Sequence, residues 1–594
     1  MKTNKLSELR FRLKERGLFG YIIPSNDPHF GEYIQDYYKC REWISGFTGS
    51  AGTVVVTQTQ AALWTDSRYF IQAESQLVGS GIELKKIGVA GEPTIADWLK
   101  DQYILGYKIG VDSALFSVSD VESLKNQLSP FSLEMSDDLF VDVWQDRPSL
   151  KFCDLFGLDL SYCGVSTIDK LKLLSKNNNF TKKTALITTV CDDIAWLCNL
   201  RGSDIEYNPL PMCKAIVTSS KIHLFCNLSG LSQQLISELN ENKIEIYNYV
   251  DFENKSKEIC AGKDVLINPD RTAYSVYSII EPIALSIKFD TQRGGIIGKQ
   301  KAVKNEVELE GFRKACEIDG VAWVRFLKKI EENVESGVIM AEHELADEIQ
   351  KIRAESEFYK GESFSPIVAF GASGAAPHYS LSKENPIILR EGSLLLDTGG
   401  QYLYGTTDTT RTLFLGEPTE EFKADYTAVL KGMIALSCAV FKKGTRGASL
   451  DFLARGEVYK AGRSYLHGTG HGIGHFLCVH EGPQSIRMEE NPVILEVGMV
   501  QSNEPAIYVP GKYGIRIENM IACVESFKSE QGEFLEFETL TLVPIDLKLA
   551  DLSKLCKSEI KWLKAYHRRV YDRLSVHLDD SEKRWLLSKT SSLD

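Results

Sequence analysis

The sequence predicts an α/β (more broadly α+β) protein of several domains, with two related α/β domains followed by a region of antiparallel sheet. Three observations lead to this prediction. The chain has 594 residues, more than one ordinary hydrophobic core accommodates. A short motif from its first 50 residues recurs near residue 200. Beyond a long amphipathic segment near residue 305, β-type runs are punctuated by glycine.

The N-terminal half carries one internal repeat. The first copy is WISGFTGS at residues 43–50 and the second is WLCNLRGS at 196–203, with Trp, Gly and Ser at the same spacing. A β-type run follows each copy, TVVVT after the first and AIVT after the second. We therefore expect two related α/β domains, at 1–150 and 151–298, in place of one large domain.

A charged amphipathic helix begins at about Asn305, and we expect it to open a third domain over residues 299–545. Its apolar residues recur at helical spacing: Leu309, Phe312, Cys316, Val324, Leu327 and Ile330. A helical extension over 546–594 ends the chain. Its broken apolar stripe is Leu552, Leu555, Leu563, Tyr566 and Val570. Such a stripe is more typical of packing within a chain than of a partner surface.

Composition narrows the classes of partner. The chain is 43% hydrophobic and 25% charged, as in soluble globular proteins, and its net charge of −13 disfavours nucleic acid or anionic membrane as the main partner. No apolar run approaches the roughly 18 residues that a membrane span needs, and the N-terminus lacks the apolar core of a signal peptide. The 13 cysteines form no CxxC pair, which indicates reduced thiols in a cytoplasmic protein.

The segment HGTGHGIGHF, residues 467–476, repeats histidine every fourth residue at His467, His471 and His475. Helical spacing would stack the three as metal ligands, but each interspersed glycine costs roughly 1 kcal/mol in a helix. The glycines fall on every second residue, so an extended chain puts them on one face and the histidines on the other. Successive histidines would then lie about 13 Å apart, too far to share one ion. We expect one ligand, its neighbours in a substrate groove, and another backbone behind the glycines.

Two acidic sites flank a glycine-rich turn in LLLDTGGQYLYGTTDTTRT, residues 394–412. Asp397 ends a run of leucines, and Asp408 lies among threonines. A carboxylate that closes an apolar strand is unfavourable to bury unless it is paired or bound to a metal ion. For either aspartate alone, a turn or cap role is the commoner explanation.

A second acidic pair lies in NEPAIYVPGKYGIRIEN, residues 503–519. Glu504 and Glu518 each lie seven residues from Gly511, within a Pro-Gly turn flanked by alternating apolar residues. A hairpin folded about that turn sets the two glutamates opposite each other on one face. Facing carboxylates repel, and a cation between them removes the repulsion. The alternative is an exposed pair at the base of a hairpin.

Four carboxylates and one histidine make an oxygen-rich site with room for two divalent ions. That ligand set suits Mn²⁺, Co²⁺, Fe²⁺ or Zn²⁺ in a dinuclear centre and does not suit a structural zinc. Two such ions lower the pKa of a bridging water and polarise a carbonyl, so the expected reaction class is hydrolysis. No GxSxG, P-loop or GxGxxG pattern offers a serious rival.

Five motifs, LLLDTG, TTDTTRT, HGTGHGIG, NEPA and RIEN, resemble in this order the ligand motifs of the pita-bread metallopeptidases. The stretches SGFTGSAGT, WTDSRYFIQA, DDIAWLCNLRGSDIEYNP and HGTGHGIGHFLCVHEGP narrow the resemblance to the long, three-domain form of aminopeptidase P (Xaa-Pro aminopeptidase). The resemblance covers nearly the whole chain. It implies two creatinase-like N-terminal domains, a pita-bread catalytic domain and a helical C-terminal extension.

The resemblance also implies the ligands of two metal ions: Asp397, Asp408, His471, Glu504 and Glu518. Asp408 and Glu518 would bridge both ions, and His471 would complete the shell of one ion together with Glu504. Mn²⁺ is the first expectation for both ions, with Co²⁺, Zn²⁺ and Fe²⁺ as the alternatives. The implied activity is hydrolysis, by a metal-bound hydroxide, of the bond between an N-terminal residue and a following proline.

Other roles follow from the same resemblance. Glu504 would relay a proton from the attacking water to the leaving proline nitrogen. His378 and His480 match histidines that position substrate and stabilise the tetrahedral intermediate, and His467 matches one near the N-terminal side of the substrate. Arg516, on the same strand face as the last glutamate ligand, is the expected partner behind the ligands. The resemblance further suggests a homodimer, with the helical tail as a candidate contributor.

The sequence departs from the family pattern at two positions. Ala506 stands where the family usually has glycine, which would slightly alter the backbone beside Glu504. His475 stands where a small or variable residue is usual, and we expect it on the groove wall without a role. Neither change removes a ligand.

Three kinds of relative are the alternatives to an aminopeptidase: a dipeptidase, binding proteins and a metal-free hydrolase. Prolidase, which cleaves dipeptides, is shorter and lacks the doubled N-terminal region. Histone-chaperone and growth-regulating relatives keep the fold as binding proteins but lose metal ligands, and creatinase is a metal-free hydrolase. All five ligand positions are filled here, which disfavours the binding proteins and creatinase.

Overall fold

The computed structural model describes residues 5–102 and 106–591. The described residues belong to two compact units: an N-terminal unit with the bounds Met1–Leu158 and Val165–Ile297, and a C-terminal unit with the bounds Asp159–Gly164 and Gly298–Asp594. Among the described residues, no helix combines the length and the apolar composition that crossing a membrane requires.

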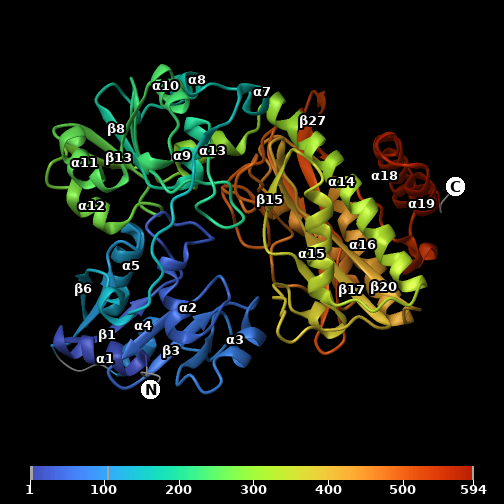
Figure 1. The fold of residues 1–594 in the computed structure, drawn as a ribbon, viewed down its shortest axis with the longest axis horizontal. Coiled ribbons are helices and arrows are strands. Elements are labelled where there is room, and N and C mark those ends of the chain that lie inside the picture. The colour runs from blue at the N-terminus through green and yellow to red at the C-terminus, as the bar shows by residue number, and fades with distance from the viewer. Residues whose placement is uncertain (1–4, 103–105, 592–594) are drawn as a thin grey trace. The chain divides into compact units, whose positions relative to one another are not determined.

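The N-terminal unit contains two six-stranded sheets of one topology (Figure 1). The first has the order β4-β3-β2-β1-β5-β6, and the second has the order β12-β11-β10-β8-β13-β14. In each sheet, the second, third and fourth strands of this order pair antiparallel with one another. All other neighbouring strands pair parallel. The strands are β1 (Leu18–Ile23), β2 (Thr53–Thr57), β3 (Ala61–Thr65), β4 (Glu83–Lys86), β5 (Lys108–Asp112), β6 (Ser132–Ser136), β8 (Thr184–Thr188), β10 (Lys214–Thr218), β11 (Ile222–Cys226), β12 (Ile244–Asn248), β13 (Asp264–Ile267) and β14 (Ser286–Phe289).

The repeated sequence motif occupies equivalent places beside the two sheets. Its tryptophans lie in α2 (Cys40–Ser45) and α9 (Cys191–Cys198); β2 follows α2 directly, and β10 follows α9 after the two-residue strand β9 (Leu200–Arg201), which lies outside the sheet. Gly46 and Asn199, three residues after the tryptophans, end the two helices in the left-handed conformation, with φ of 73° and 50°. Glycine and asparagine tolerate this conformation best, so the motif encodes a helix stop. The prediction of two related α/β domains is confirmed.

The C-terminal unit is built on antiparallel sheet, as the glycine-punctuated runs predict. One sheet has the order β16-β17-β20, another has the order β21-β28-β27-β24, and β25 and β26 form a hairpin. The strands are β16 (Ile367–Phe370), β17 (Gly392–Thr398), β20 (Thr409–Leu415), β21 (Val440–Lys442), β24 (Val500–Asn503), β25 (Ala506–Val509), β26 (Tyr513–Arg516), β27 (Asn519–Ser529) and β28 (Gly532–Thr539).

The long helix α14 (Glu306–Glu335) begins where the sequence predicts it. The Asn305 side chain accepts hydrogen bonds from the first turn, and the Glu308 side chain bonds back to the Asn305 N–H, which completes a capping box. All six predicted apolar positions are buried. With α15 (Glu342–Arg353), this helix packs on the β16-β17-β20 sheet through one apolar cluster that includes Trp323, Ile349 and Leu394 (Figure 1).

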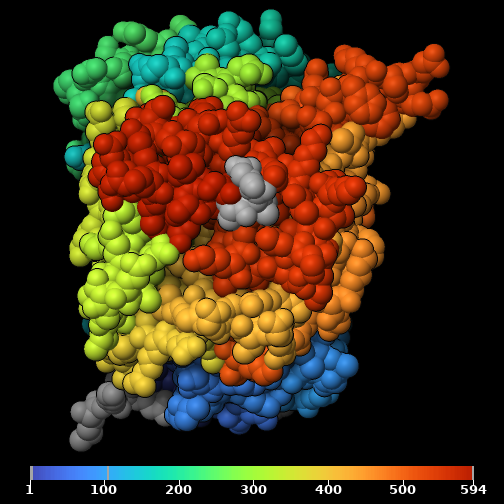
Figure 2. Space-filling view, turned by 90° about the vertical axis from the view of Figure 1, so that its right-hand side faces the viewer, coloured from blue at the N-terminus to red at the C-terminus, as the bar shows by residue number. Residues whose placement is uncertain are grey.

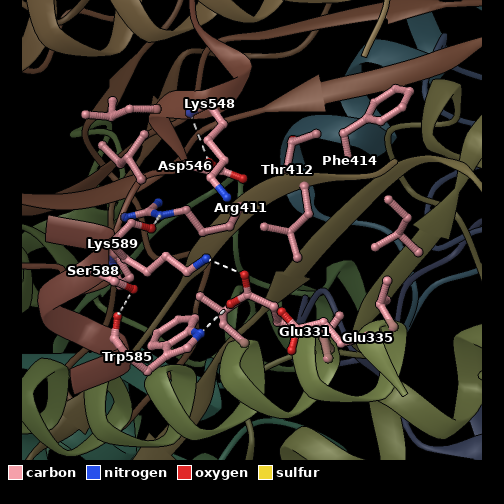
Figure 3. Close-up of a pocket in the computed structure, with 18 of the residues that line it drawn as sticks. Glu331, Glu335, Arg411, Thr412, Phe414, Asp546, Lys548, Trp585, Ser588 and Lys589 are labelled. Atoms are coloured by element: carbon pink, nitrogen blue, oxygen red, sulfur yellow. Dashed lines mark hydrogen bonds and ion pairs between the residues drawn. The ribbon is translucent and has the colours of Figure 1, made fainter. Parts of the chain in front are cut away.

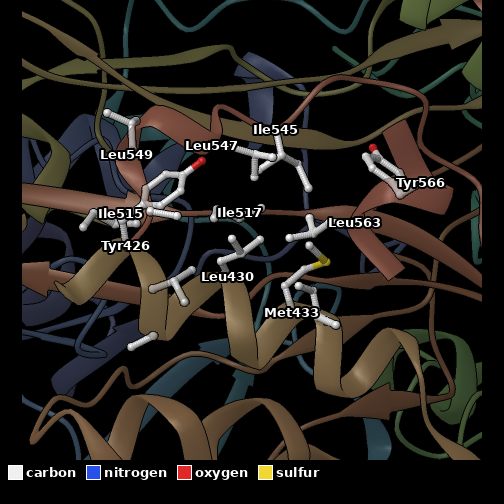
Figure 4. Packing of buried hydrophobic residues seen from close by; sticks show 14 of the residues in the cluster. Tyr426, Leu430, Met433, Ile515, Ile517, Ile545, Leu547, Leu549, Leu563 and Tyr566 are labelled. Carbon is white, nitrogen blue, oxygen red and sulfur yellow. The ribbon is translucent and has the colours of Figure 1, made fainter. Parts of the chain in front are cut away.

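The C-terminal extension forms α18 (Lys557–Leu574) and α19 (Asp580–Thr590), and in Figure 2 this red segment covers part of the C-terminal unit. Leu563, Tyr566 and Val570 are buried in a cluster with α16 (Glu420–Ser437) and the β25-β26 hairpin (Figure 4). The stripe therefore packs within the chain. Because these side chains are already covered, they are not available to pair two subunits.

Candidate metal centre

The two aspartates lie on neighbouring strands. Asp397 is in β17, opposite Thr410 of β20, and Asp408 immediately precedes β20. Both side chains are buried. The antiparallel pairing of β17 and β20 turns the glycine-rich segment between them, so two residues that are eleven positions apart in sequence approach each other.

The two glutamates lie opposite each other, as the hairpin prediction requires. Asn503 pairs with Asn519 between β24 and β27, and Ala506 pairs with Arg516 between β25 and β26. Both pairings have one register, which sets Glu504 opposite Glu518. The turn is centred on Gly511, whose φ of 74° is readily adopted by glycine. Ala506 is fully buried in the strand and keeps the pairing regular.

His471 lies in β22 (Gly470–His471), where the glycines admit another backbone as predicted. A Cβ atom on Gly470 would lie 2.1 Å from the Ser502 carbonyl oxygen. The His471 Nδ1–H donates to the Gly472 carbonyl oxygen at 3.0 Å, because a carbonyl can only accept. Nε2 is thereby directed at the acids, 3.4 Å from Asp408 Oδ2 and 3.6 Å from Glu504 Oε1.

The extended conformation does not continue to His475, so the prediction that it lies on the groove wall is wrong. The chain turns after β22, and Gly474 N–H donates to the Cys478 carbonyl at 2.9 Å. His475 is 2% exposed and packs edge-on against Phe312 of α14, with ring centroids 5.5 Å apart. Glycine at every second residue is compatible with a strand and also with a series of tight turns. Here tertiary packing favours the turns.

The electrostatics of this acidic cluster fit a cation. Asp408, His471 and Glu518 each offer one ligand atom within 4.8 Å of the others. Burial raises the pKa of Glu518 well above its usual range, and the neighbouring carboxylates of Asp408 and Asp397 raise it further. Burial also raises the pKa of Asp397 and of Glu504. Carboxylates that resist ionising together require a positive charge among them.

The Asp397 oxygen without a hydrogen bond favours a metal ion as that charge, and the pKa of His471 indicates which proton the metal would displace. Asp397 Oδ2 accepts from Arg516 at 2.5 Å, whereas its buried Oδ1 has no hydrogen-bond donor among the described residues. Burial lowers the pKa of His471, but Asp408 and Glu504 outweigh it and raise this pKa to about 9. Without a metal, a proton therefore supplies the positive charge. Metal uptake must displace that proton, so metal binding tightens as pH rises.

Tyr508 links the predicted substrate residues and was missed from the sequence. Its hydroxyl lies 2.9 Å from His467 Nε2 and 2.5 Å from Arg516. Arg516 in turn pairs with Asp397 at 2.5 Å, so one chain of contacts joins His467 to an aspartate of the acidic cluster. Tyr508 follows Glu504 by four residues along the same hairpin arm, and that even spacing is the signal that could have identified it.

The two other predicted histidines lie on loops. The exposed ring of His480 stands edge-on to His471, with centroids 4.3 Å apart and planes at 87°. Half-buried His378 follows a short 3-10 helix, Gly371–Ala375, that packs on β26. A Cβ atom on Gly514 of β26 would lie 1.7 Å from the Gly374 carbonyl oxygen, so close backbone packing fixes that loop beside the hairpin.

A buried ion cluster supports the histidine loop and was also missed. Glu481 lies between Lys304 Nζ at 2.5 Å and Lys301 Nζ at 3.5 Å, and all three side chains are at most 2% exposed. The Glu481 N–H donates to the Gly472 carbonyl oxygen at 2.8 Å, the same oxygen that orients His471. Lys304 and Glu481 are far apart in sequence, so no local pattern reveals their pairing.

We expect Glu481→Gln to destabilise the protein by about 3–5 kcal/mol, because two buried ammonium groups lose their carboxylate. Glu533→Gln is the matched control: Glu533 lies between Lys443 at 2.7 Å and Lys528 at 2.9 Å, but at the surface. The control should change the free energy of unfolding little, because water and salt screen exposed pairs. Urea denaturation measures both. Equal, small effects would show that the buried cluster adds no stability.

Known protein families match most of the chain. The family model of metallopeptidase family M24 matches residues 310–525, and its C-terminal region matches 533–593. Models of the creatinase/prolidase N-terminal domain match 5–142 and 146–308.

Relatives match over nearly the full chain. Probable Xaa-Pro aminopeptidase P of Laccaria bicolor is 38% identical, over 100% of this chain and 94% of its own length. That of Botryotinia fuckeliana is 40% identical, over 96% and 89%. The crystal structure of X-prolyl aminopeptidase from Caenorhabditis elegans, described as a cytosolic enzyme with a di-nuclear active site, superposes with a TM-score of 0.92. That structure is 35% identical and covers 99% of this chain and 100% of its own.

Proposed function

The chain belongs to metallopeptidase family M24, among the Xaa-Pro aminopeptidases P, and we propose that it removes the N-terminal residue of peptides whose second residue is proline. The observation that carries the proposal is the acidic cluster around His471, which has a ligand-type side chain at every position of the family's ligand motifs. The non-catalytic relatives differ from this chain at these positions, because they lack some of the metal-ligating side chains.

We propose that two divalent ions are held by Asp397, Asp408, His471, Glu504 and Glu518. Asp408 and Glu518 would contact both ions, which is consistent with their close approach to each other and to His471. Mn²⁺ is the metal we favour, since carboxylate-rich sites suit it, with Co²⁺, Zn²⁺ and Fe²⁺ as alternatives. When bound, two such ions activate a water molecule and polarise the scissile carbonyl.

Glu504 is the residue we propose to move the proton. Its carboxylate lies 3.6 Å from His471 and 3.7 Å from His467, between the metal ligands and the substrate side. The leaving proline nitrogen has no N–H as an amide and must gain a proton to depart. Burial raises the pKa of Glu504, which favours a carboxyl group able both to accept and to deliver that proton.

The histidines would act on the substrate. We propose that His480 and His378 donate to the oxyanion of the tetrahedral intermediate, and that His467 lies near the substrate N-terminus. The contact of His467 with Tyr508 and, through it, with Arg516 orients its ring. Replacing one of these three histidines leaves the metal ligands in place. The replacement should therefore lower turnover more than it lowers metal content.

Activity on an Xaa-Pro-Xaa tripeptide after EDTA treatment and re-addition of single metals tests this function. We expect EDTA to abolish activity and Mn²⁺ to restore it most fully. An Xaa-Pro dipeptide is the control substrate, because prolidase prefers it. Activity confined to the dipeptide would favour prolidase, and activity that survives complete metal removal would favour a creatinase-like, metal-free reaction.

We also propose a cytoplasmic homodimer. The Caenorhabditis elegans neighbour is described as cytosolic, and every described cysteine is a free thiol. Sedimentation of the full-length protein should give twice the 66.6 kDa of the chain. Deletion of residues 550–594 should cause aggregation, because it uncovers the apolar cluster around Leu563 and Tyr566. A monomer at micromolar concentration would contradict the dimer.

A further inference from the structure

A cavity of about 290 Å³ lies in the C-terminal unit apart from the metal centre (Figure 3). Its walls come from α14, from β20, from the segment 544–548 and from α19, and none of the five proposed ligands lines it. The volume is close to the lower end of the roughly 300–1,000 Å³ of small-molecule pockets. Most of the lining is apolar: Leu327, Ile330, Val334, Leu413, Phe414, Leu415, Pro544, Ile545, Leu547 and Trp585.

The basic groups of the wall have no buried donor to spare for an anion. Arg411 donates to four backbone carbonyls, those of Thr410, Glu518, Val543 and Pro544, and also to the side chains of Asn519 and Tyr566. Lys589 is held by Glu331 at 2.6 Å, and Trp585 donates to the same carboxylate, as Figure 3 shows. Lys548 is exposed, and its ammonium is therefore hydrated.

One acidic group of the wall, Asp546, is in the opposite situation. Asp546 accepts one hydrogen bond, from the Lys548 N–H at 3.1 Å, and no ammonium or guanidinium among the described residues lies within ion-pair distance of it. Burial raises its pKa despite the field of Lys589 and Lys548. A partly dehydrated carboxylate without a cation is unfavourable, and a bound cation would relieve this.

We propose that this cavity binds a small apolar primary amine, with its ammonium group against the Asp546 carboxylate and its hydrocarbon part against the apolar wall. The apolar lining selects a hydrocarbon group, and the half-buried Asp546 carboxylate, which has no ion pair among the described residues, selects a positive charge. The site is distinct from the metal centre, because none of the five proposed ligands lines it; Arg411 of its wall contacts the metal centre only through the backbone carbonyl of Glu518.

Calorimetric titration of the full-length, metal-loaded protein with phenethylamine tests this proposal. We expect saturable binding, and at least tenfold weaker binding of 2-phenylethanol, which keeps the ring and lacks the charge. Asp546→Asn keeps the size of the side chain and removes its charge, so it should weaken phenethylamine by about tenfold or more. Asp551→Asn is the matched control, since Asp551 caps the next short 3-10 helix in the same way and does not line the cavity.

A second variant leaves Asp546 intact, because this residue also caps the turn Leu547–Leu549. Ser588→Trp on α19 fills the cavity with an indole ring and should abolish binding of phenethylamine. The proposal fails if phenethylamine does not bind saturably, or if the amine and the alcohol bind equally. It also fails if binding survives both Asp546→Asn and Ser588→Trp, since the amine would then occupy another site, such as the acidic metal centre.

Discussion

Asp408→Ala is expected to abolish activity and metal binding together. Asp408 lies within 4.8 Å of ligand atoms of both His471 and Glu518, and its Oδ2 is 3.4 Å from His471 Nε2. A carboxylate placed between two ions contributes to the affinity of both, so its loss weakens both sites at once. We therefore expect an effect larger than the 10- to 100-fold that is typical of losing an outer-shell partner.

Metal content by mass spectrometry and turnover of an Xaa-Pro-Xaa peptide measure this effect. Asp425→Ala is the control, because Asp425 is another buried aspartate of the same unit, paired with Arg463 and Tyr513 outside the acidic cluster. The control can lower stability but should keep its metals. Two metals retained by Asp408→Ala, with normal turnover, would refute the assignment of this centre.

His480→Ala is expected to keep the metals and to slow turnover by about 10²–10³, which corresponds to the roughly 2.7–4 kcal/mol of one oxyanion donor. The exposed His480 ring stands edge-on to His471 and is not part of the ligand group of Asp408, His471 and Glu518. In the proposed function, its loss removes a donor toward substrate without removing a ligand.

Turnover at saturating substrate, together with metal content, separates the two roles of a histidine. His577→Ala is the matched control, because His577 is also exposed but pairs with Glu317 beside the C-terminal extension. It should change neither quantity. If His480→Ala instead loses metal, His480 is a ligand and the division of the histidines into ligands and substrate residues is wrong.

The sequence by itself determined the elements whose signals are local. The capping box at Asn305 and the apolar period behind it specify α14, because helix initiation and amphipathicity depend on residues three or four positions apart. The symmetric spacing about Gly511 specifies the hairpin that sets Glu504 opposite Glu518, because strand register follows the turn and the alternation. The repeated motif specifies where α2 and α9 end, because the left-handed residue that ends each helix lies three positions after the tryptophan.

Only the tertiary structure decided which side chains meet across long stretches of chain. The pairing of Lys304 with Glu481, the burial of His475 against Phe312 and the Tyr508 contact of His467 depend on the path of the chain. The alternating glycines do not predict the turn after His471, because glycine adopts many backbone conformations equally well. Local sequence patterns determine whether a segment forms a helix or a strand. Packing between segments determines which residues each face contacts, and this packing forms the buried ion cluster, the histidine loop and the cavity.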